Sequence, residues 1–443
     1  MTQTDTAQRA RPYPLIAALA VAVPGAYLGL AAYLGLPAVD LGHPVEAAIF
    51  GAAIVGAAFA LSWAAEAAQV DINAGLALAL LALLAVLPEY AVDFVFTVDC
   101  GNAYSSGSED ATEVCSLALA NMTGANRVLV GIGWPLVVLV ATFAVWRNRR
   151  SGAEDPGTST TQIGEVKLRP ALSVEVVFLG IATLYSLTLP LRSSITLVDA
   201  VVFVGIFAAY AWRLARMEPS EPSLMGVSAW VGGLETRQRR SMVTAMFVVA
   251  AAIILLAAEH FADSLVGTGR DLGVDEFLLV QWVAPLASEA PELIVACLYA
   301  WRLKAEDSLG TLLSSKVNQW TLLVGGLPIV FSLTALTTAG LPIDTHQRYE
   351  LLITAAQSFF AVAILLDRKL TYKGALMLLA LFVPQLLVSV LASERTNQLT
   401  ILAISALYGV LAITELVRRR RRIVTVIKDG TVTPPKELAD QPA

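Results

Sequence analysis

Acidic side chains stand inside two apolar stretches of the chain, each beside a proline. Glu89 follows Pro88, and Glu289 and Glu292 flank Pro291. A carboxylate within a membrane span is energetically costly and by default marks a functional site. A proline inside a helix removes one backbone hydrogen bond and leaves a carbonyl free one turn earlier. Carboxylate and carbonyl oxygens together are the ligands that hard cations such as Ca²⁺ prefer.

A second copy of this arrangement occurs in the other half of the chain. Residues 87–89 (Leu-Pro-Glu) match 290–292 (Ala-Pro-Glu), and the polar segment 119–126 matches 309–316. Proline-interrupted, acid-bearing spans in corresponding places of two halves are typical of secondary transporters, whose site lies near the bilayer midplane where the repeats meet.

The composition places these elements in a membrane. Of the 443 residues, 56% are hydrophobic and 15% are charged, whereas soluble domains contain about 25% charged residues. The sequence has no phosphate-binding glycine loop, metal-protease motif or His/Cys cluster, which argues against an ATP-driven pump and predicts neither an enzymatic activity nor a cofactor. The predicted partners are small inorganic cations and the lipid bilayer, and no nucleic acid.

Apolar runs of about 20 residues, the length of a helical span, recur along the chain. The run 13–36 is too long for a signal-peptide core, and we interpret it as the first span. The fourth and ninth runs are long and contain Gly and polar positions, so we expect kinks or tilt there. The twelve predicted spans are 13–36, 44–68, 74–97, 114–146, 171–190, 194–215, 241–265, 275–301, 308–336, 348–366, 374–392 and 397–417.

The positions of Lys and Arg orient these spans. With twelve spans and the N-terminus inside, most of the 30 Lys and Arg residues fall on the cytoplasmic side, as the positive-inside rule requires. The exceptions are Arg192, Arg270, Arg348 and Arg395 outside, and Arg127 and Lys316 within spans. We therefore predict a multi-pass protein of the plasma membrane with both termini in the cytoplasm.

Each half holds five spans, and an odd number inverts the second half relative to the first. The predicted fold is therefore all-α, with about twelve transmembrane helices in two inverted five-helix repeats plus one peripheral helix at each end. A short interfacial helix is expected around Leu224–Leu234. We expect the tail after Arg418–Arg422 to be disordered and these arginines to anchor the chain to anionic lipid. The predicted segments are 1–43 (tail and span 1), 44–215 (first repeat), 216–240 (cytoplasmic linker), 241–392 (second repeat) and 393–443 (span 12 and basic tail).

The polar elements resemble those of the calcium/cation antiporter superfamily, which includes sodium/calcium and calcium/proton exchangers. Its members carry two inverted repeats, each with a Gly-Thr-Ser-x-Pro-Glu element on one helix and a Gly-Asn-x-x-Gly-Ser-Asn element on the next. The matching segments here are 85–89 and 120–126 in the first repeat, and 286–292 and 310–316 in the second. The resemblance covers roughly 44–146 and 241–392, and it implies a helical antiporter that works by alternating access.

The resemblance also implies roles for single residues. Glu89 and Glu292 are the expected paired carboxylates that bind the transported metal cation. Asn121 occupies the family's Asn position in the first repeat, Ser288 matches the hydroxyl four residues before the glutamate, and Thr311 stands in place of the second repeat's Asn. The cargo implied is Ca²⁺ or Na⁺, exchanged for H⁺ or Na⁺.

The sequence departs from the family pattern in ways that affect the choice of ion. Ala and Val replace hydroxyl residues before the first glutamate, Glu289 replaces Ser, and Lys316 replaces the second Asn of its element. Several presumed sodium ligands are therefore missing. We hypothesise that Lys316 fills the space of a sodium ion in relatives and pairs with Glu289 or Glu292.

The balance of charge at the predicted site favours one divalent ion. Four acids against two bases leave two negative charges, which suit one Ca²⁺, or protons and monovalent cations in alternation, but not three Na⁺. The residues counted are Glu89, Asp93, Glu289 and Glu292, against Lys316 and Arg127, which follows Asn126.

Other interpretations stay open. A sodium/proton exchanger would use the same carboxylates, and a transport-dead homologue acting as a sensor or assembly partner would fit the missing hydroxyls. The carboxylates could also form a buried structural ion-pair network with Lys316 and Arg127. An intramembrane protease fits less well, because such enzymes favour catalytic aspartates. Cys100 and Cys115 bracket one polar loop and can form a disulfide if it faces an oxidising compartment.

Overall fold

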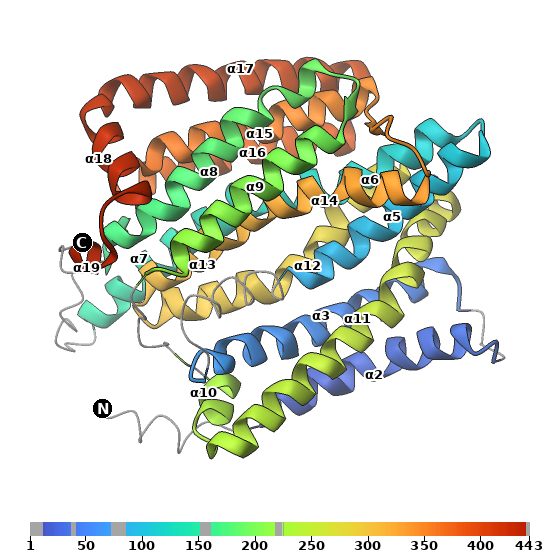
Figure 1. The fold of residues 1–443 in the computed structure, drawn as a ribbon, viewed down its shortest axis with the longest axis horizontal. Coiled ribbons are helices and arrows are strands. Elements are labelled where there is room, and N and C mark those ends of the chain that lie inside the picture. The colour runs from blue at the N-terminus through green and yellow to red at the C-terminus, as the bar shows by residue number, and fades with distance from the viewer. Residues whose placement is uncertain are drawn as a thin grey trace. The chain divides into compact units, whose positions relative to one another are not determined.

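The computed structural model describes residues 12–36, 41–71, 86–150, 161–217, 224 and 226–439. Most of these residues are helical (Figure 1). The α-helices are α2 (Tyr13–Tyr33), α3 (His43–Ala68), α5 (Leu87–Ser106), α6 (Ala111–Val128), α7 (Trp134–Arg150), α8 (Ser173–Ser186), α9 (Leu197–Leu214), α10 (Val227–Gly232), α11 (Thr236–Leu272), α12 (Glu276–Trp301), α13 (Ala305–Asn318), α14 (Val324–Thr334), α15 (Thr345–Leu365), α16 (Tyr372–Leu391), α17 (Glu394–Arg418), α18 (Arg420–Thr431) and α19 (Pro435–Ala439).

Short elements complete the described fold. Strand β2 pairs antiparallel with both β1 and β5, with Val166 opposite Thr161 and Leu370, and β3 pairs antiparallel with β4. These elements are β1 (Thr161–Gln162), β2 (Glu165–Lys167), β3 (Ser194–Ile195), β4 (Leu341–Pro342), β5 (Lys369–Thr371), the 3₁₀ turns η2 (Pro170–Leu172) and η3 (Leu189–Leu191), and the π turns η1 (Leu129–Gly133) and η4 (Gln319–Leu323).

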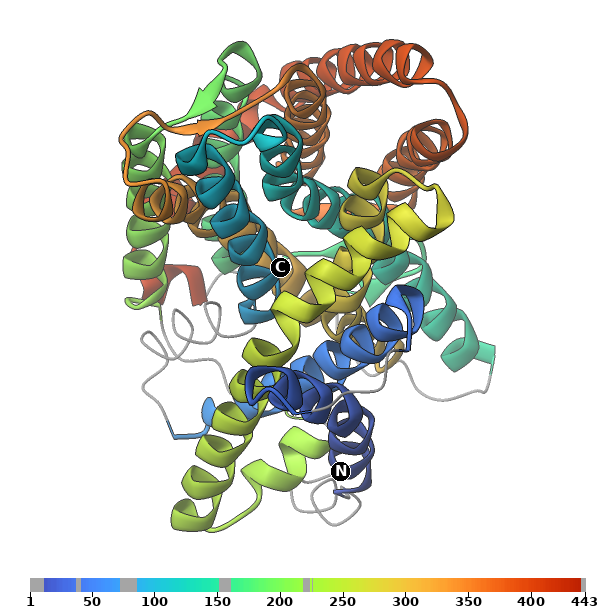
Figure 2. The ribbon, with the colours of Figure 1, turned by 90° about the vertical axis from the view of Figure 1, so that its right-hand side faces the viewer.

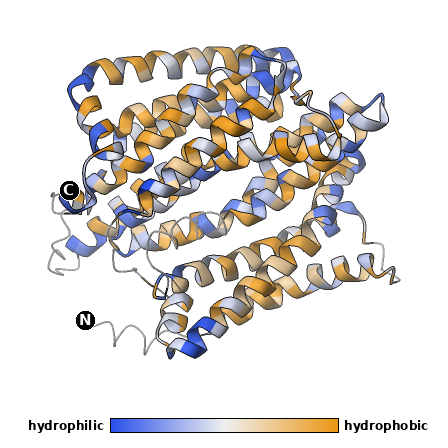
Figure 3. Ribbon diagram, in the orientation of Figure 1, coloured by the Kyte–Doolittle hydropathy of each residue, from blue (hydrophilic) through white to orange (hydrophobic). Residues whose placement is uncertain are grey.

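The helices are apolar along most of their length (Figure 3). Ten helical stretches among the described residues are long and apolar enough to cross a membrane, and α12 gives an eleventh if its two halves form one span. The prediction of an all-helical membrane fold is confirmed. The predicted span 74–97 lies largely outside the described residues, so the count of twelve stays a prediction.

The chain forms two compact units, each of which takes segments from both predicted repeats. Unit 1 comprises Met1–Phe96 and Glu218–Glu292, and unit 2 comprises Thr97–Met217 and Leu293–Ala443. The predicted repeat and linker boundaries remain predictions.

Small residues bring the helices of unit 1 close together. Helix α3 packs against both α2 and α11. A Cβ atom on Gly29 of α2 would lie 2.2 Å from the carbonyl oxygen of Leu256, and one on Gly56 of α3 would lie 2.3 Å from that of Ala18. Backbones approach this closely in membranes only where side chains are minimal. The short helix expected around Leu224–Leu234 is present as α10 and packs on α3.

Two long helices of unit 2 contain a π turn, at the places where kinks were expected. Helix α6 continues through η1 into α7, and α13 continues through η4 into α14. A proline, Pro135 or Pro328, follows each π turn shortly afterwards. Proline cannot donate the backbone hydrogen bond that an α-helix requires at its position. A wider turn accommodates the missing hydrogen bond. Such π turns occur frequently at functional sites.

The predicted disordered tail is wrong within the described residues. The chain turns after α17 and forms α18, which packs on α8 (Figures 1 and 2). The Arg213 guanidinium donates hydrogen bonds to the carbonyls of Asp429, Gly430 and Thr433. Polar composition suggested disorder, but these buried contacts, which are distant in sequence, hold the segment in place. The structure also joins Cys100 to Cys115 by a disulfide.

Candidate functional site

Three carboxyl groups of unit 1 gather where α5 begins and α12 bends. Glu89, Glu289 and Glu292 are 1%, 0% and 7% exposed. The Glu89 carboxyl is hydrogen-bonded to that of Glu289 and interacts electrostatically with Glu292 and Asp93. Since a carboxylate can only accept hydrogen bonds, two carboxyl groups bond to one another only when they share a proton. The structure thus brings Glu89 and Glu292 together, and adds Glu289 as the direct partner of Glu89.

The prolines explain why these carboxyls meet. Helix α12 bends by 51° between Ala290 and Glu292, across residue 291, where a proline removes a backbone hydrogen bond. Glu89 lies in the first turn of α5, directly after Pro88. Proline is well tolerated at that position, and the positive end of the helix dipole favours a carboxylate there.

The oxygens around these carboxyls differ in their contacts. One oxygen of Glu89, Oε2, is buried and has no hydrogen-bond partner among the described residues. The Ser288 hydroxyl, 3% exposed, lies 3.4 Å from the carbonyls of Ala284 and Pro285. Within the described ranges, no three His, Cys, Asp or Glu side chains have the geometry of a metal site.

In unit 2, Lys316 is fully buried and held by Asn126. Its ammonium donates to the Asn126 side-chain oxygen over 2.6 Å and to the Asn126 carbonyl over 3.0 Å. It also lies 4.9 Å from the ring centroid of Trp320, within cation–π range. The amide of Asn126 donates to the carbonyl of Met122 over 2.8 Å, which fixes its orientation. The prediction named Glu289 or Glu292 as the partner of Lys316 and missed Asn126.

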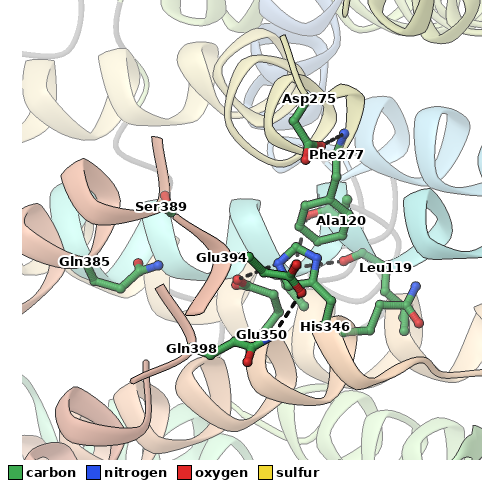
Figure 4. A network of polar contacts seen from close by, with 12 residues as sticks. Leu119, Ala120, Asp275, Phe277, His346, Glu350, Gln385, Ser389, Glu394 and Gln398 are labelled. Atoms are coloured by element: carbon green, nitrogen blue, oxygen red, sulfur yellow. Dashed lines mark hydrogen bonds and ion pairs between the residues drawn. The ribbon is translucent and has the colours of Figure 1, made fainter. Parts of the chain in front are cut away.

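Arg127 forms a second buried pair in unit 2. Its guanidinium lies 2.6 Å from the carboxylate of Glu350 on α15, and both side chains are 1% exposed. It also donates to the amide oxygen of Gln385 on α16 over 3.1 Å. His346, one turn before Glu350, lies 3.7 Å from its other oxygen (Figure 4). The network thus ties α6 to α15 and α16.

Sequence reasoning missed Glu350 and Gln385 because neither belongs to a repeated element. Glu350 stands at the polar start of the predicted span 348–366, directly after Arg348 and Tyr349, where a charged residue is ordinary, so no local signal marked it. Of the other predicted residues, Asn121 is fully buried in α6. Thr311 is exposed, and its hydroxyl donates to the carbonyl of Asp307 in its own helix.

Comparison with known proteins places these features in a family. The sequence profile described as sodium/calcium exchanger protein matches residues 45–215 and 242–391. No curated protein sequence matches.

Solved structures are also similar. The crystal structure of the H⁺/Ca²⁺ exchanger CAX is 39% identical with a TM-score of 0.81, over 96% of this chain and 98% of that one. The structure of native YfkE is 15% identical with a TM-score of 0.56, over 84% and 99%. The sodium-calcium exchanger NCX_Mj is 13% identical with a TM-score of 0.51, over 79% and 99%. The last two likenesses concern the fold alone.

Proposed function

Because the chain belongs to the sodium/calcium exchanger protein family, we propose that it exchanges Ca²⁺ for protons across the membrane by alternating access. Its similarity to an H⁺/Ca²⁺ exchanger at 39% identity over nearly the whole chain supports this choice of ions. The family model itself does not distinguish proton coupling from sodium coupling, so the argument for protons depends on the residues.

The observation that carries the proposal is the carboxyl cluster of Glu89, Glu289 and Glu292. The Glu89 carboxyl is hydrogen-bonded to that of Glu289; a proton held between them and a Ca²⁺ ion would need the same oxygens, so the cluster would hold one or the other. When Ca²⁺ binds, Glu89 and Glu292 supply two negative charges, and the displaced proton leaves on the side from which Ca²⁺ enters. When Ca²⁺ departs on the opposite side, a proton taken up from that side returns to the Glu89–Glu289 pair. Such mutual exclusion is the physical requirement for antiport.

Lys316 supports protons over sodium as the counter-ion. In the family pattern, the second Asn of each polar element falls at positions 126 and 316. Here a lysine occupies one of them and donates to the Asn at the other. An ammonium that already uses the Asn126 oxygens leaves them unavailable to Na⁺ and adds a repelling charge. The predicted roles of Asn121, Ser288 and Thr311 as further cation ligands rest on the family resemblance and remain predictions.

Flux measurements test the proposal. Purified protein in liposomes should take up Ca²⁺ when a pH gradient is imposed, and should not do so with a Na⁺ gradient alone. Glu89→Gln and Glu292→Gln should each lower the initial rate at least tenfold. The exposed Glu113→Gln serves as the matched control and should leave the rate unchanged.

Three results would contradict the proposal. Ca²⁺ uptake driven by Na⁺ would indicate sodium coupling. Na⁺ movement against a pH gradient with no Ca²⁺ flux would identify a sodium/proton exchanger. Correctly folded protein with no flux under any gradient would favour a non-transporting homologue.

A further inference from the structure

A recess lined by five consecutive arginines lies at the elbow between α17 and α18. Its volume is about 570 Å³, and its lining consists of Asp367, Val417 and Arg418–Arg422. One carboxylate therefore faces five guanidinium groups. From this geometry we propose that the elbow binds the phosphate group of an anionic phospholipid.

Part of the arginine cluster is fixed by the protein itself. Arg419 is 19% exposed, pairs with Asp367 over 2.8 Å, and donates to the carbonyl of Ala363 over 3.0 Å. Arg418 and Arg419 both pair with Glu415. These contacts neutralise two of the five arginines and hold the base of the recess rigid.

The other three arginines have no acidic partner in the part of the chain that the structure describes. Among the described residues, Arg420, Arg421 and Arg422 form no ion pair, and all three are exposed. They leave three uncompensated positive charges beside one hollow. Guanidinium groups bind phosphate in bidentate fashion with better geometry than lysine provides, so a phosphate is the chemistry that suits this surplus.

The elbow is held in a fixed shape. Beyond the contacts of Arg213, a Cβ atom on Gly430 of α18 would lie 2.7 Å from the carbonyl of Ser173 in α8, and Arg368 lies 3.6 Å from Asp429. The positive-inside rule accounts for arginines after the last span. It does not require the chain to turn back and dock so that they surround a recess. Preorganisation of this kind lowers the cost of binding a ligand.

Apolar side chains beside the arginines favour a lipid over free phosphate. Val417, which lines the recess, is 61% exposed, and Val424 and Ile427 of α18 are 72% and 48% exposed. Helices that carry basic residues on one face and apolar residues on another lie at the membrane interface, where basic clusters attract anionic lipids. A phospholipid would place its phosphate among the guanidiniums and its chains along these side chains.

Lipid retention measured by native mass spectrometry tests the inference. Full-length protein is purified and incubated with phosphatidylglycerol or phosphatidylcholine, and the protein–lipid adducts are counted. We expect the wild type to retain phosphatidylglycerol at least fivefold more than phosphatidylcholine. The triple variant Arg420→Gln, Arg421→Gln, Arg422→Gln should lose that preference. The control triple Arg149→Gln, Arg150→Gln, Arg302→Gln removes three exposed arginines elsewhere in unit 2 and should keep it.

A second variant separates recognition from charge alone. Changing Arg420, Arg421 and Arg422 to Lys keeps the positive charge that orients the last span but removes the bidentate donors. We expect this variant to insert normally and to lose most of the preference. Retention equal to wild type, or an equal loss in the control triple, would show only general electrostatic attraction and would overturn the proposal. Displacement of the lipid by millimolar inorganic phosphate would identify a free-phosphate site instead, and would equally overturn it.

Discussion

The ammonium of Lys316 donates a hydrogen bond of 2.6 Å to the side-chain oxygen of Asn126. These two positions correspond in the two polar elements, so the matched ends of α6 and α13 are in direct contact within unit 2. A cation carried by the protein thus stands where the family pattern has an amide oxygen.

Replacing this cation should change which ions the protein can use. In Lys316→Asn the fixed charge disappears and an amide oxygen is restored, so we expect a Na⁺ gradient to drive Ca²⁺ uptake where it does not in the wild type. The measurement is Ca²⁺ flux with Na⁺ and pH gradients imposed separately. Lys373→Asn, at an exposed position, is the control. Unchanged ion selectivity and stoichiometry in the Lys316 variant would refute the hypothesis.

The number of protons exchanged should depend on Glu289. Glu289→Gln removes the carboxyl that is hydrogen-bonded to Glu89 and leaves Glu292 in place. We expect Ca²⁺ transport to continue with fewer protons moved per Ca²⁺, measured as the ratio of pH change to Ca²⁺ uptake in the same vesicles. The same ratio in the variant and the wild type would show that Glu289 takes no part in coupling.

The Arg127–Glu350 pair should be important for stability. Breaking a buried ion pair by removing one partner typically costs about 3–5 kcal/mol, because the other charge is left without compensation. Arg127→Met should therefore lower the melting temperature strongly, and the double change Arg127→Met with Glu350→Met should lower it less. Arg270→Met breaks an exposed pair with Glu276 and should cost about 0–1 kcal/mol. A double variant no more stable than the single one would contradict this account.

Acid should weaken the contact between Asp71 and Arg239. The two hydrogen bonds from the Arg239 guanidinium, at 2.7 and 2.8 Å, hold the pKa of Asp71 below its usual value. A lowered pKa in the folded state stabilises the fold above the unfolded-state pKa, about 3.9, and the benefit is lost as the pH falls through the folded-state pKa. The melting temperature should thus decrease as the pH is lowered below about 4. This decrease should be less steep in Arg239→Gln. Parallel pH profiles for the two proteins would contradict the linkage.

The disulfide between Cys100 and Cys115 joins α5 to α6 across a separation of 15 residues. Closing a loop of this length stabilises a fold by about 3 kcal/mol in the chain-entropy model. Changing both cysteines to Ser should lower the melting temperature of oxidised protein by several degrees, and reductant should have the same effect on the wild type. Cys297→Ser, which removes the free cysteine, should have little effect. Insensitivity to both treatments would argue against the bridge.

The fold class and the identity of the acidic residues could be predicted from the order of the amino acids alone. Apolar runs with few charges specify membrane helices whatever their neighbours are, because the bilayer leaves no other partner for the backbone. The acids next to Pro88 and Pro291 were also recognisable from the sequence, because an acid and a proline each carry an energetic cost inside a membrane span.

The contacts between these groups depend on the packing of the folded chain. Three contacts depend on how separate helices pack, and nothing in the local spacing encodes them. They join Glu89 to Glu289, Lys316 to Asn126, and Arg127 to Glu350. The folded tail shows the same limit: its polar composition resembled disorder, yet Arg213 and Gly430 dock it against α8. Hydropathy reports the cost of leaving water residue by residue, whereas pairing energies arise only between residues that the fold brings together.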